Sequence, residues 1–316
     1  MAARTLLNVQ DLSLTEQDAV LNAADWYLPR IERGGAKWAH LRGVSTLLMF
    51  YEASTRTRVS FELAAKLLGS DTINVSAKGS SVEKGESIAD TAETLSAMGF
   101  AITVMRHAGA DAVALFARHF AGAVLNAGAG RGEHPTQALL DALTLRRAGL
   151  LAAGMRLAIV GDIRHSRVMH SNLALLTARG MEVVLVAPPP LMPPAWRRGL
   201  LPQGVSWEPD FDCVLPTLDA VMMLRMQRER MEGGLLPAGA EYGALYGLDQ
   251  RRLGLLPKHA AVLHPGPVNR GVEVCEAVYL DPRCRINNQV TAGVAVRCAL
   301  LCWAAGRPLV PEGGEA

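Results

Sequence analysis

Short apolar runs alternate with longer stretches of mixed polarity along the whole chain. The runs have the length of buried strands, and they lie at 44–50, 72–75, 101–105, 123–126, 156–160, 182–187, 220–225 and 260–263. The stretches between them have the length and polarity of helices, and the clearest lie at 56–68, 87–98, 110–120, 134–148 and 166–178. This alternation predicts an α/β fold with mainly parallel sheets flanked by helices.

One predicted helix, at 134–148, has no flexible linker on either side. Pro135 suits its first turn, and Gly149 suits the position after its last turn. We therefore expect a rigid connector between two halves of the chain, with the apolar segment 291–305 as a second helix that returns to the first half. The predicted domains are residues 1–135 plus 290–316, and residues 136–289.

The composition allows a sizeable core and gives no sign of a highly charged partner. Of the 316 residues, 50% are hydrophobic and 20% are charged, and the formal net charge is +2. This balance predicts no nucleic-acid partner and no membrane-surface partner. The N-terminal residues do not resemble a secretory signal, and every apolar stretch is shorter than the ~18 residues needed to span a bilayer. We expect a cytoplasmic protein.

The five cysteines do not form a metal-binding pattern. They are odd in number, lie late in the chain and lack the C-x-x-C spacing of zinc sites. Cys298 and Cys302 are four residues apart in an apolar segment, a spacing that suits two packed thiols on one helix face. The sequence therefore favours free thiols in a reducing compartment over a metal site.

The run Ser54-Thr55-Arg56-Thr57 lies between a predicted strand and a predicted helix. Free backbone N–H groups at a helix N-terminus favour an anion. The hydroxyl groups add donors, and the forked guanidinium of Arg56 suits phosphate oxygens. The competing interpretation is an ordinary helix start with a solvated arginine. No Walker lysine and no G-x-G-x-x-G are present, so the usual nucleotide loops are excluded.

Further polar residues follow other strands of the first half, where open α/β sheets bind ligands. Arg106 comes directly after the run that ends at Met105, and His134 and Gln137 share one face at a helix start. A neutral histidine there could donate to a carbonyl oxygen as negative charge develops. The alternative is that His134 serves only to begin the helix.

In the second half, Gly161 and Asp162 stand where a dinucleotide fingerprint would begin, but its second and third glycines are missing. Arg167, and then Arg225 and Gln227 after a later strand, could meet at the strand ends and bind a dicarboxylate. Surface arginines on loops are the competing interpretation.

The loop His264-Pro265-Gly266-Pro267 also follows a strand of the second half. Its prolines and glycine fix the backbone, which could offer carbonyl acceptors to an amide N–H₂ group. From composition alone, a purely structural turn explains the loop nearly as well.

Taken together, these motifs resemble the aspartate carbamoyltransferase family. The resemblance covers about residues 45–297 and rests on seven motifs in the expected order. They are 50–62 (Phe-Tyr-Glu-Ala-Ser-Thr-Arg-Thr-Arg-Val-Ser-Phe-Glu), 84–87 (Lys-Gly-Glu-Ser), 105–107 (Met-Arg-His), 134–137 (His-Pro-Thr-Gln), Gly161-Asp162 with Arg167, 225–230 (Arg-Met-Gln-Arg-Glu-Arg) and 264–267 (His-Pro-Gly-Pro).

Ornithine carbamoyltransferases share some of these motifs, but they typically carry His-Cys-Leu-Pro in the last one and an Asn-rich segment at the position of Arg167. The arginines of this chain would repel a cationic amino acid and hold aspartate.

The resemblance implies a function and a role for each residue. The expected reaction transfers the carbamoyl group of carbamoyl phosphate to the amine of L-aspartate, in pyrimidine biosynthesis, without metal or organic cofactor. Ser54, Thr55, Arg56 and Thr57 would bind the phosphate. Arg106 and His134, with Thr57, would polarise the carbamoyl oxygen, and Gln137 with the backbone of Gly266 and Pro267 would bind the amide. The aspartate site would comprise Arg167, Arg225, Gln227 and Lys84.

The family resemblance also implies an assembly. Ser80 and Lys84 would come from the neighbouring subunit of a homotrimer or a multiple of trimers. Glu52 would pair with Arg167 and Arg230 when the two domains close. The sequence leaves open whether regulatory chains or dihydroorotase join the trimer. An inactive scaffold for such a partner is the remaining alternative, although every expected site residue is present.

Overall fold

A computed structural model describes residues 4–76, 85–226 and 239–311. The chain forms two compact units, Met1–Leu143 with Val290–Ala316 and Thr144–Gln289. Each unit contains one parallel sheet flanked by helices, so the predicted fold class is confirmed. The divisions between the units fall within α5 (Pro135–Arg147) and within α12 (Ile286–Ala304).

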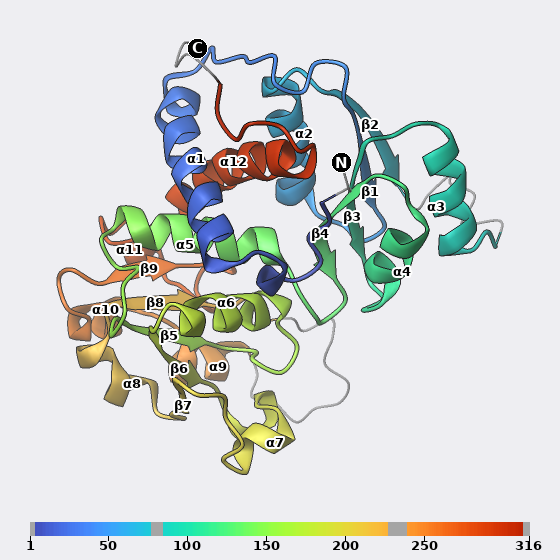
Figure 1. The fold of residues 1–316 in the computed structure, drawn as a ribbon. Coiled ribbons are helices and arrows are strands. Elements are labelled where there is room, and N and C mark those ends of the chain that lie inside the picture. The colour runs from blue at the N-terminus through green and yellow to red at the C-terminus, as the bar shows by residue number, and fades with distance from the viewer. Residues whose placement is uncertain (1–3, 77–84, 227–238, 312–316) are drawn as a thin grey trace. The chain divides into compact units, whose positions relative to one another are not determined.

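The sheet of the first unit has the strand order β2-β1-β3-β4, and every pairing is parallel. Its strands are β1 (Ser45–Phe50), β2 (Asp71–Ser76), β3 (Ile102–His107) and β4 (Ala123–Ala129). Figure 1 shows α3 (Ile88–Ala97) and α4 (Ala112–His119) on one side of this sheet and α2 (Thr55–Leu67) on the other. α1 (Leu14–Arg33) and the short turn η1 (Val9–Asp11) precede the first strand.

The core of this unit follows from the burial of its strands. β1 and β4 are buried along almost their whole length, so both faces of the sheet are covered at these two strands. Leu47, Met49, Met105 and Phe116 belong to one apolar cluster between the sheet and its helices. Continuous apolar runs are the pattern expected of such doubly covered parallel strands.

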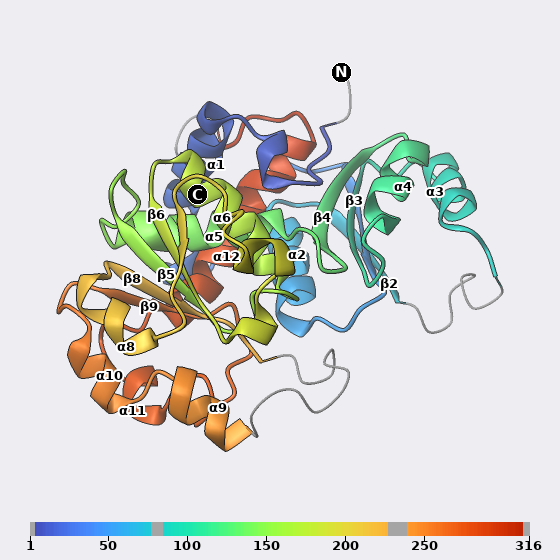
Figure 2. The same cartoon turned by 90° about the horizontal axis from the view of Figure 1, so that it is seen from below.

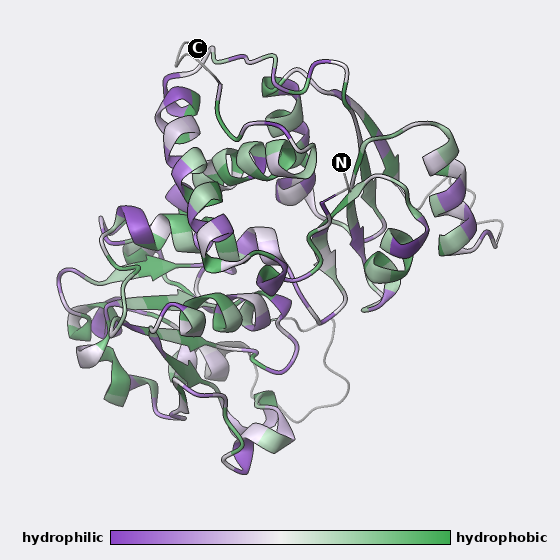
Figure 3. Cartoon of the chain, viewed as in Figure 1, coloured by the Kyte–Doolittle hydropathy of each residue, from purple (hydrophilic) through white to green (hydrophobic). Residues whose placement is uncertain are grey.

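The sheet of the second unit has the order β7-β6-β5-β8-β9, again with parallel pairings only. Its strands are β5 (Arg156–Val160), β6 (Glu182–Val186), β7 (Val205–Trp207), β8 (Ala220–Met223) and β9 (Ala261–Leu263). Its helices are α6 (Arg167–Ala178), α7 (Pro194–Arg197), α8 (Phe211–Val214), α9 (Gly239–Tyr246), α10 (Gln250–Leu255) and α11 (Glu276–Tyr279), with the turns η3 (Pro189–Leu191) and η4 (Leu215–Thr217). Figure 2 shows α8 and α9 on the face opposite α6, and Figure 3 shows the apolar character of β6, β8 and β9.

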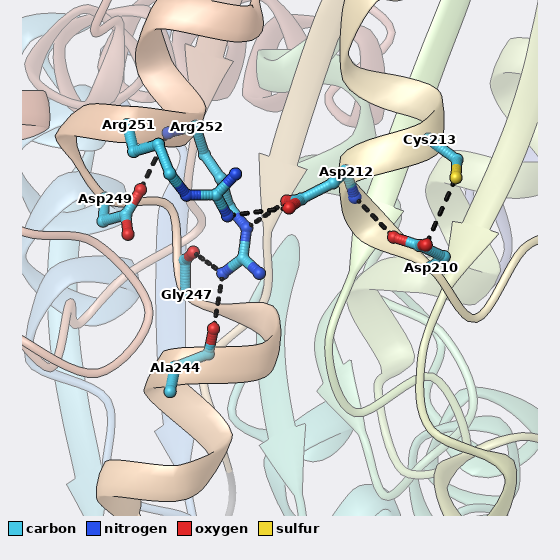
Figure 4. A network of polar contacts seen from close by, with 8 residues as sticks. All are labelled: Asp210, Asp212, Cys213, Ala244, Gly247, Asp249, Arg251 and Arg252. Atoms are coloured by element: carbon cyan, nitrogen blue, oxygen red, sulfur yellow. Dashed lines mark hydrogen bonds and ion pairs between the residues drawn. The ribbon is translucent and has the colours of Figure 1, made fainter.

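A buried arginine joins three helices of this second unit (Figure 4). The Nε of Arg252 donates to the carboxylate of Asp212 on α8 at 2.6 Å. Its Nη1 donates to the carbonyl oxygens of Ala244 and Gly247 at the end of α9, at 3.0 and 2.7 Å. Because the last carbonyl groups of a helix lack intrahelical partners, Arg252 caps α9 while it holds α8 and α10 together.

Several predicted boundaries shift in the structure. β3 continues through His107, so Arg106 lies within the strand rather than after it, and β8 ends at Met223, before Arg225. α12 begins at Ile286, five residues earlier than predicted, because the polar residues of its first turn hid the helical pattern. The three-residue strand β7 was not predicted, since so short a run gives no periodic signal.

Candidate active site

The predicted anion-binding residues lie at the carboxyl end of β1. Ser54 occupies the N-cap position of α2, and its side chain makes no capping hydrogen bond. Thr55 and Arg56 are exposed, whereas Thr57 is buried in the first turn. The first N–H groups of α2 have no partner within the helix and are directed out of its N-terminus. This turn therefore presents hydroxyl, guanidinium and backbone donors from one short segment.

Arg106 lies on the strand adjacent to this turn. It is in register with Phe50, the last residue of β1, and its carbonyl oxygen accepts the N–H of Tyr51 at 2.9 Å. The β3–β4 register shifts between Met105 and His107, an irregularity that is common beside functional sites. The guanidinium Nη2 of Arg106 donates to Glu52 Oε1 at 3.2 Å, a contact that the sequence analysis did not anticipate.

His134 directly precedes α5 and is 3% exposed. Its carbonyl oxygen accepts the N–H of Gln137 at 3.0 Å, which makes it the first residue of the helical hydrogen-bonding pattern. The amide Nε2 of Gln137 donates to Asp141 Oδ1 at 2.9 Å, one turn further along α5. His134 and Gln137 thus lie beyond the end of β4, at the same edge of the sheet as the residues after β1 and β3.

The strand order explains why these residues lie at one end of the same sheet. The chain places β2 on one side of β1 and β3 on the other, so the direction in which strands are added reverses between β1 and β3. Open α/β sheets bind ligands at such a switch point, outside the carboxyl ends of the strands. The turn at 54–57 and Arg106 flank this position, and together they could bind a phosphate and stabilise negative charge on a neighbouring carbonyl oxygen.

The second sheet has the same design, with its switch point between β5 and β8. Gly161 follows β5 with φ +129°, and an added Cβ there would lie 3.0 Å from the hydroxyl of Tyr242. Ser166 caps α6 by accepting the N–H of Met169, and the buried Arg167 is the first residue of that helix. Arg225 follows β8, two residues beyond its end.

Arg167 and Arg225 therefore lie at the carboxyl ends of adjacent strands within the second unit. Both side chains are at least partly buried, which argues against the interpretation as solvated loop arginines. Two guanidinium groups at one switch point suit an anionic ligand with more than one carboxylate.

The carboxylate of Glu273, which the sequence analysis missed, holds this edge of the sheet together. It is fully buried and accepts the N–H of Met226 at 3.0 Å and the N–H and side-chain amide of Asn269 at 2.6 and 2.7 Å. His264 Nε2 lies 3.7 Å from it. Glu273 thereby connects the segment that carries Arg225 with the loop that carries Gly266 and Pro267.

The charge of Glu273 is consistent with this position. Burial by itself would raise its pKa, but the nearby His264 side chain and the hydrogen bonds from Met226 and Asn269 outweigh burial and keep the pKa below the ordinary glutamate value. Nothing in the local sequence marks this residue, because its partners lie 4, 9 and 47 residues away.

The loop itself is held at its first residue, His264. The N–H of His264 donates to Gln289 Oε1 at 2.9 Å, and the ring Nδ1 of His264 accepts the N–H of Gly266 at 2.8 Å. The peptide bond between Gly266 and Pro267 is cis. The hydrogen bonds of His264 hold the start of this loop at the carboxyl end of β9.

Four residues named from the sequence lie outside the described part of the chain: Ser80, Lys84, Gln227 and Arg230.

Cys298 and Cys302 lie on the same helix, as the sequence predicted. Cys298 and Cys302 are buried thiols on α12, with Cys298 Sγ 3.9 Å from the carbonyl oxygen of Ala64 and Cys302 Sγ 3.7 Å from the hydroxyl of Tyr27. Among the described residues, no group of three or more His, Cys, Asp or Glu side chains could hold a metal ion.

Over the same residues, no helix is both long and apolar enough to cross a membrane.

Comparison with known proteins defines the class. Residues 4–147 match the carbamoyl-P binding domain of aspartate/ornithine carbamoyltransferases, and residues 153–304 match the Asp/Orn binding domain. The chain belongs to the aspartate/ornithine carbamoyltransferase family.

The particular relatives are aspartate carbamoyltransferases. The chain is 52% identical to an "Aspartate carbamoyltransferase catalytic subunit" of Acidothermus cellulolyticus, over 94% of this chain and 91% of that one. It is 50% identical to a protein of the same name from Mycobacterium bovis, over 95% of each. Among solved structures, aspartate transcarbamoylase from Trypanosoma cruzi in complex with N-(phosphonacetyl)-L-aspartic acid has a TM-score of 0.84 and 32% identity, over 95% of each chain. The identification made from the sequence motifs is confirmed.

Proposed function

We propose that this chain transfers the carbamoyl group of carbamoyl phosphate to the α-amine of L-aspartate, giving N-carbamoyl-L-aspartate and phosphate for pyrimidine biosynthesis. The observation that favours aspartate over ornithine as the substrate is the pair of arginines, Arg167 and Arg225, at the switch point of the second sheet. Two guanidinium groups attract a dicarboxylate and repel a second cation.

We assign the carbamoyl phosphate site to the domain of residues 1–135 plus 290–316 and the aspartate site to residues 136–289. Within the first, Ser54, Thr55, Arg56 and Thr57 bind the phosphate at the N-terminus of α2. The matched family domain for carbamoyl phosphate, which spans residues 4–147, supports this division.

The remaining groups stabilise the reacting carbonyl. The neutral amine of aspartate attacks the carbamoyl carbon, and negative charge develops on the carbonyl oxygen near Arg106 and His134. Fixed donors of this kind each stabilise the transition state by about 2.7–4 kcal/mol. Gln137 and the backbone at Gly266 and Pro267 accept the amide N–H₂ group. The phosphate then leaves, and it takes up the proton that the amine releases.

A contact between Arg106 and Glu52 bears on the orientation of the arginine. The two side chains lie 3.2 Å apart, so the carboxylate balances the charge of the arginine. Because a guanidinium has five N–H donors, Arg106 can donate to the substrate oxygen while Nη2 holds Glu52. The role of Glu52 as a partner of Arg167 and Arg230 on domain closure stays a prediction.

The active form is a homotrimer or a multiple of trimers, in which Ser80 and Lys84 enter the site of the neighbouring subunit and Lys84 binds substrate. Two observations support an assembly. The apolar side chains of Val59 and Leu63 on α2 and of Ile73 on β2 are exposed to solvent in the single chain. β2 is also an edge strand, and proteins usually cover or protect such strands. Association with regulatory chains or dihydroorotase stays open, and the cytoplasmic location stays a prediction.

A substrate comparison tests the proposal. The purified protein is incubated with carbamoyl phosphate and either aspartate or ornithine, and carbamoyl aspartate and citrulline are quantified. We expect carbamoyl aspartate from the reaction with aspartate and no citrulline from the reaction with ornithine. Arg56→Ala serves as the control that the activity belongs to this chain. Citrulline formation would contradict the aspartate site, and no product with either amino acid would favour an inactive scaffold.

A further inference from the structure

α5 carries two buried polar residues one helical turn apart. Gln137 Nε2 donates to Asp141 Oδ1 at 2.9 Å, and Asp141 is fully buried. An ionised carboxylate can only accept hydrogen bonds, so the N–H₂ group of Gln137 must face Asp141. The carbonyl Oε1 of Gln137 is then the group turned away from Asp141.

Arg297 on α12 places a buried positive charge within electrostatic reach of Asp141. Its side chain is 3% exposed, and the guanidinium lies over the ring of Phe61 with 5.0 Å to the centroid. Burial lowers the pKa of Arg297 to about 10, while the charge of Asp141 acts in the opposite direction and favours the cation. The missing Cβ of Gly293 leaves room for the guanidinium, because a Cβ there would overlap Nη1 of Arg297.

We propose that Asp141 is a positioning residue that fixes Gln137 with Oε1 toward the carbamoyl group, and that this orientation selects ligands with an amide N–H₂ over ligands with a methyl group. The inference rests on the proposed function, in which Gln137 binds the carbamoyl amide. With Oε1 facing the ligand, Gln137 accepts a hydrogen bond from the ligand N–H₂ group and so strengthens binding. A reversed Gln137 would place its own N–H₂ group against that of the ligand. Leaving a buried donor without an acceptor weakens binding by about 10- to 100-fold.

Two stable phosphonates isolate this contact. Phosphonoacetamide carries the carbamoyl N–H₂, and acetonylphosphonate has the same shape with a methyl group in its place. Asp141→Asn is the informative variant, because Arg297 offers only donors and attracts the oxygen of the introduced amide. The nitrogen of that amide would then face Gln137 and reverse the Gln137 side chain.

The ratio of the two dissociation constants, measured by calorimetry, is the readout. The wild-type protein should prefer phosphonoacetamide, and Asp141→Asn should reduce that preference by about 10- to 100-fold. In a Gln137→Ala background the same substitution should leave the ratio unchanged, because Asp141 acts through Gln137. Asp219→Asn is the control. It weakens hydrogen bonds to Arg156 and His259 at the amino ends of strands in the second sheet, so it should lower only the melting temperature.

Several outcomes would overturn the inference. They are a wild-type protein without the preference, an Asp141→Asn protein that retains it, and an equal loss of both ligands. If Asp141→Asn does not fold, Gly293→Ala replaces it, because an added Cβ there would overlap Nη1 of Arg297 and would lie 3.2 Å from Cδ2 of Leu140. Without that cation, burial favours a protonated Asp141, which donates to Gln137 Oε1 and reverses the amide. An unchanged ratio in Gly293→Ala would then reject the role of Asp141. Failure of the wild type to bind either phosphonate would instead refute the proposed function.

Discussion

Replacement of Glu273 by alanine should lower the free energy of unfolding by about 3–5 kcal/mol. The side chain is fully buried and accepts the backbone N–H groups of Met226 and Asn269. Its removal leaves two N–H groups without a partner, each costing about 1–3 kcal/mol, and the cavity adds to the loss. The same substitution should raise the KM for aspartate, because Met226 directly follows Arg225.

Urea denaturation followed by circular dichroism measures the stability change. Glu276→Ala is the matched control, because Glu276 pairs with Arg270 at 2.7 Å while more than half of each side chain is exposed. An exposed ion pair of this kind contributes less than about 1 kcal/mol. Equal midpoints for the two alanine variants would refute the reasoning that Glu273 holds this edge of the sheet.

The pH dependence gives a second check on Glu273. Its pKa is lowered below the ordinary value of 4.5, so the ionised side chain stabilises the fold above that pH. This contribution is lost as the pH falls through the lowered pKa. The stability difference between the wild type and Glu273→Gln should therefore be constant above pH ~5 and shrink below pH ~4. A difference that grows on acidification would show that Glu273 is protonated in the folded state.

The remaining predictions concern catalysis. Arg106→Ala should lower kcat strongly, since its contact strengthens as charge develops, whereas Arg225→Ala should raise chiefly the KM for aspartate; steady-state kinetics with each substrate varied would expose a reversed pattern. Trimers reassembled from Arg56→Ala and Lys84→Ala chains should regain about one third of wild-type activity per mixed trimer, because one interface of three then carries both intact residues. Recovery no greater than that of either parent, in mixed trimers verified by mass, would show that Lys84 serves its own chain.

The sequence by itself determined the class of fold and most of the candidate site. Continuous apolar runs predicted the buried strands of both sheets, because parallel strands covered on both faces tolerate few polar residues. The donor-rich turn at 54–57 and the arginines after later strands were recognisable because ligand groups in α/β folds follow strand ends. Local pattern and motif were sufficient for these features, and the family comparison confirmed the identification.

Only the tertiary structure decided which strand ends are neighbours. The orders β2-β1-β3-β4 and β7-β6-β5-β8-β9 place a switch point beside Arg106 and another beside Arg225, and neither order can be read from periodicity along the chain. Glu273, Asp141 and Arg297 escaped the sequence analysis for the same reason. Their roles depend on burial and on hydrogen bonds or charges that come from distant parts of the chain, and a buried charge is stable only where the fold supplies its partners.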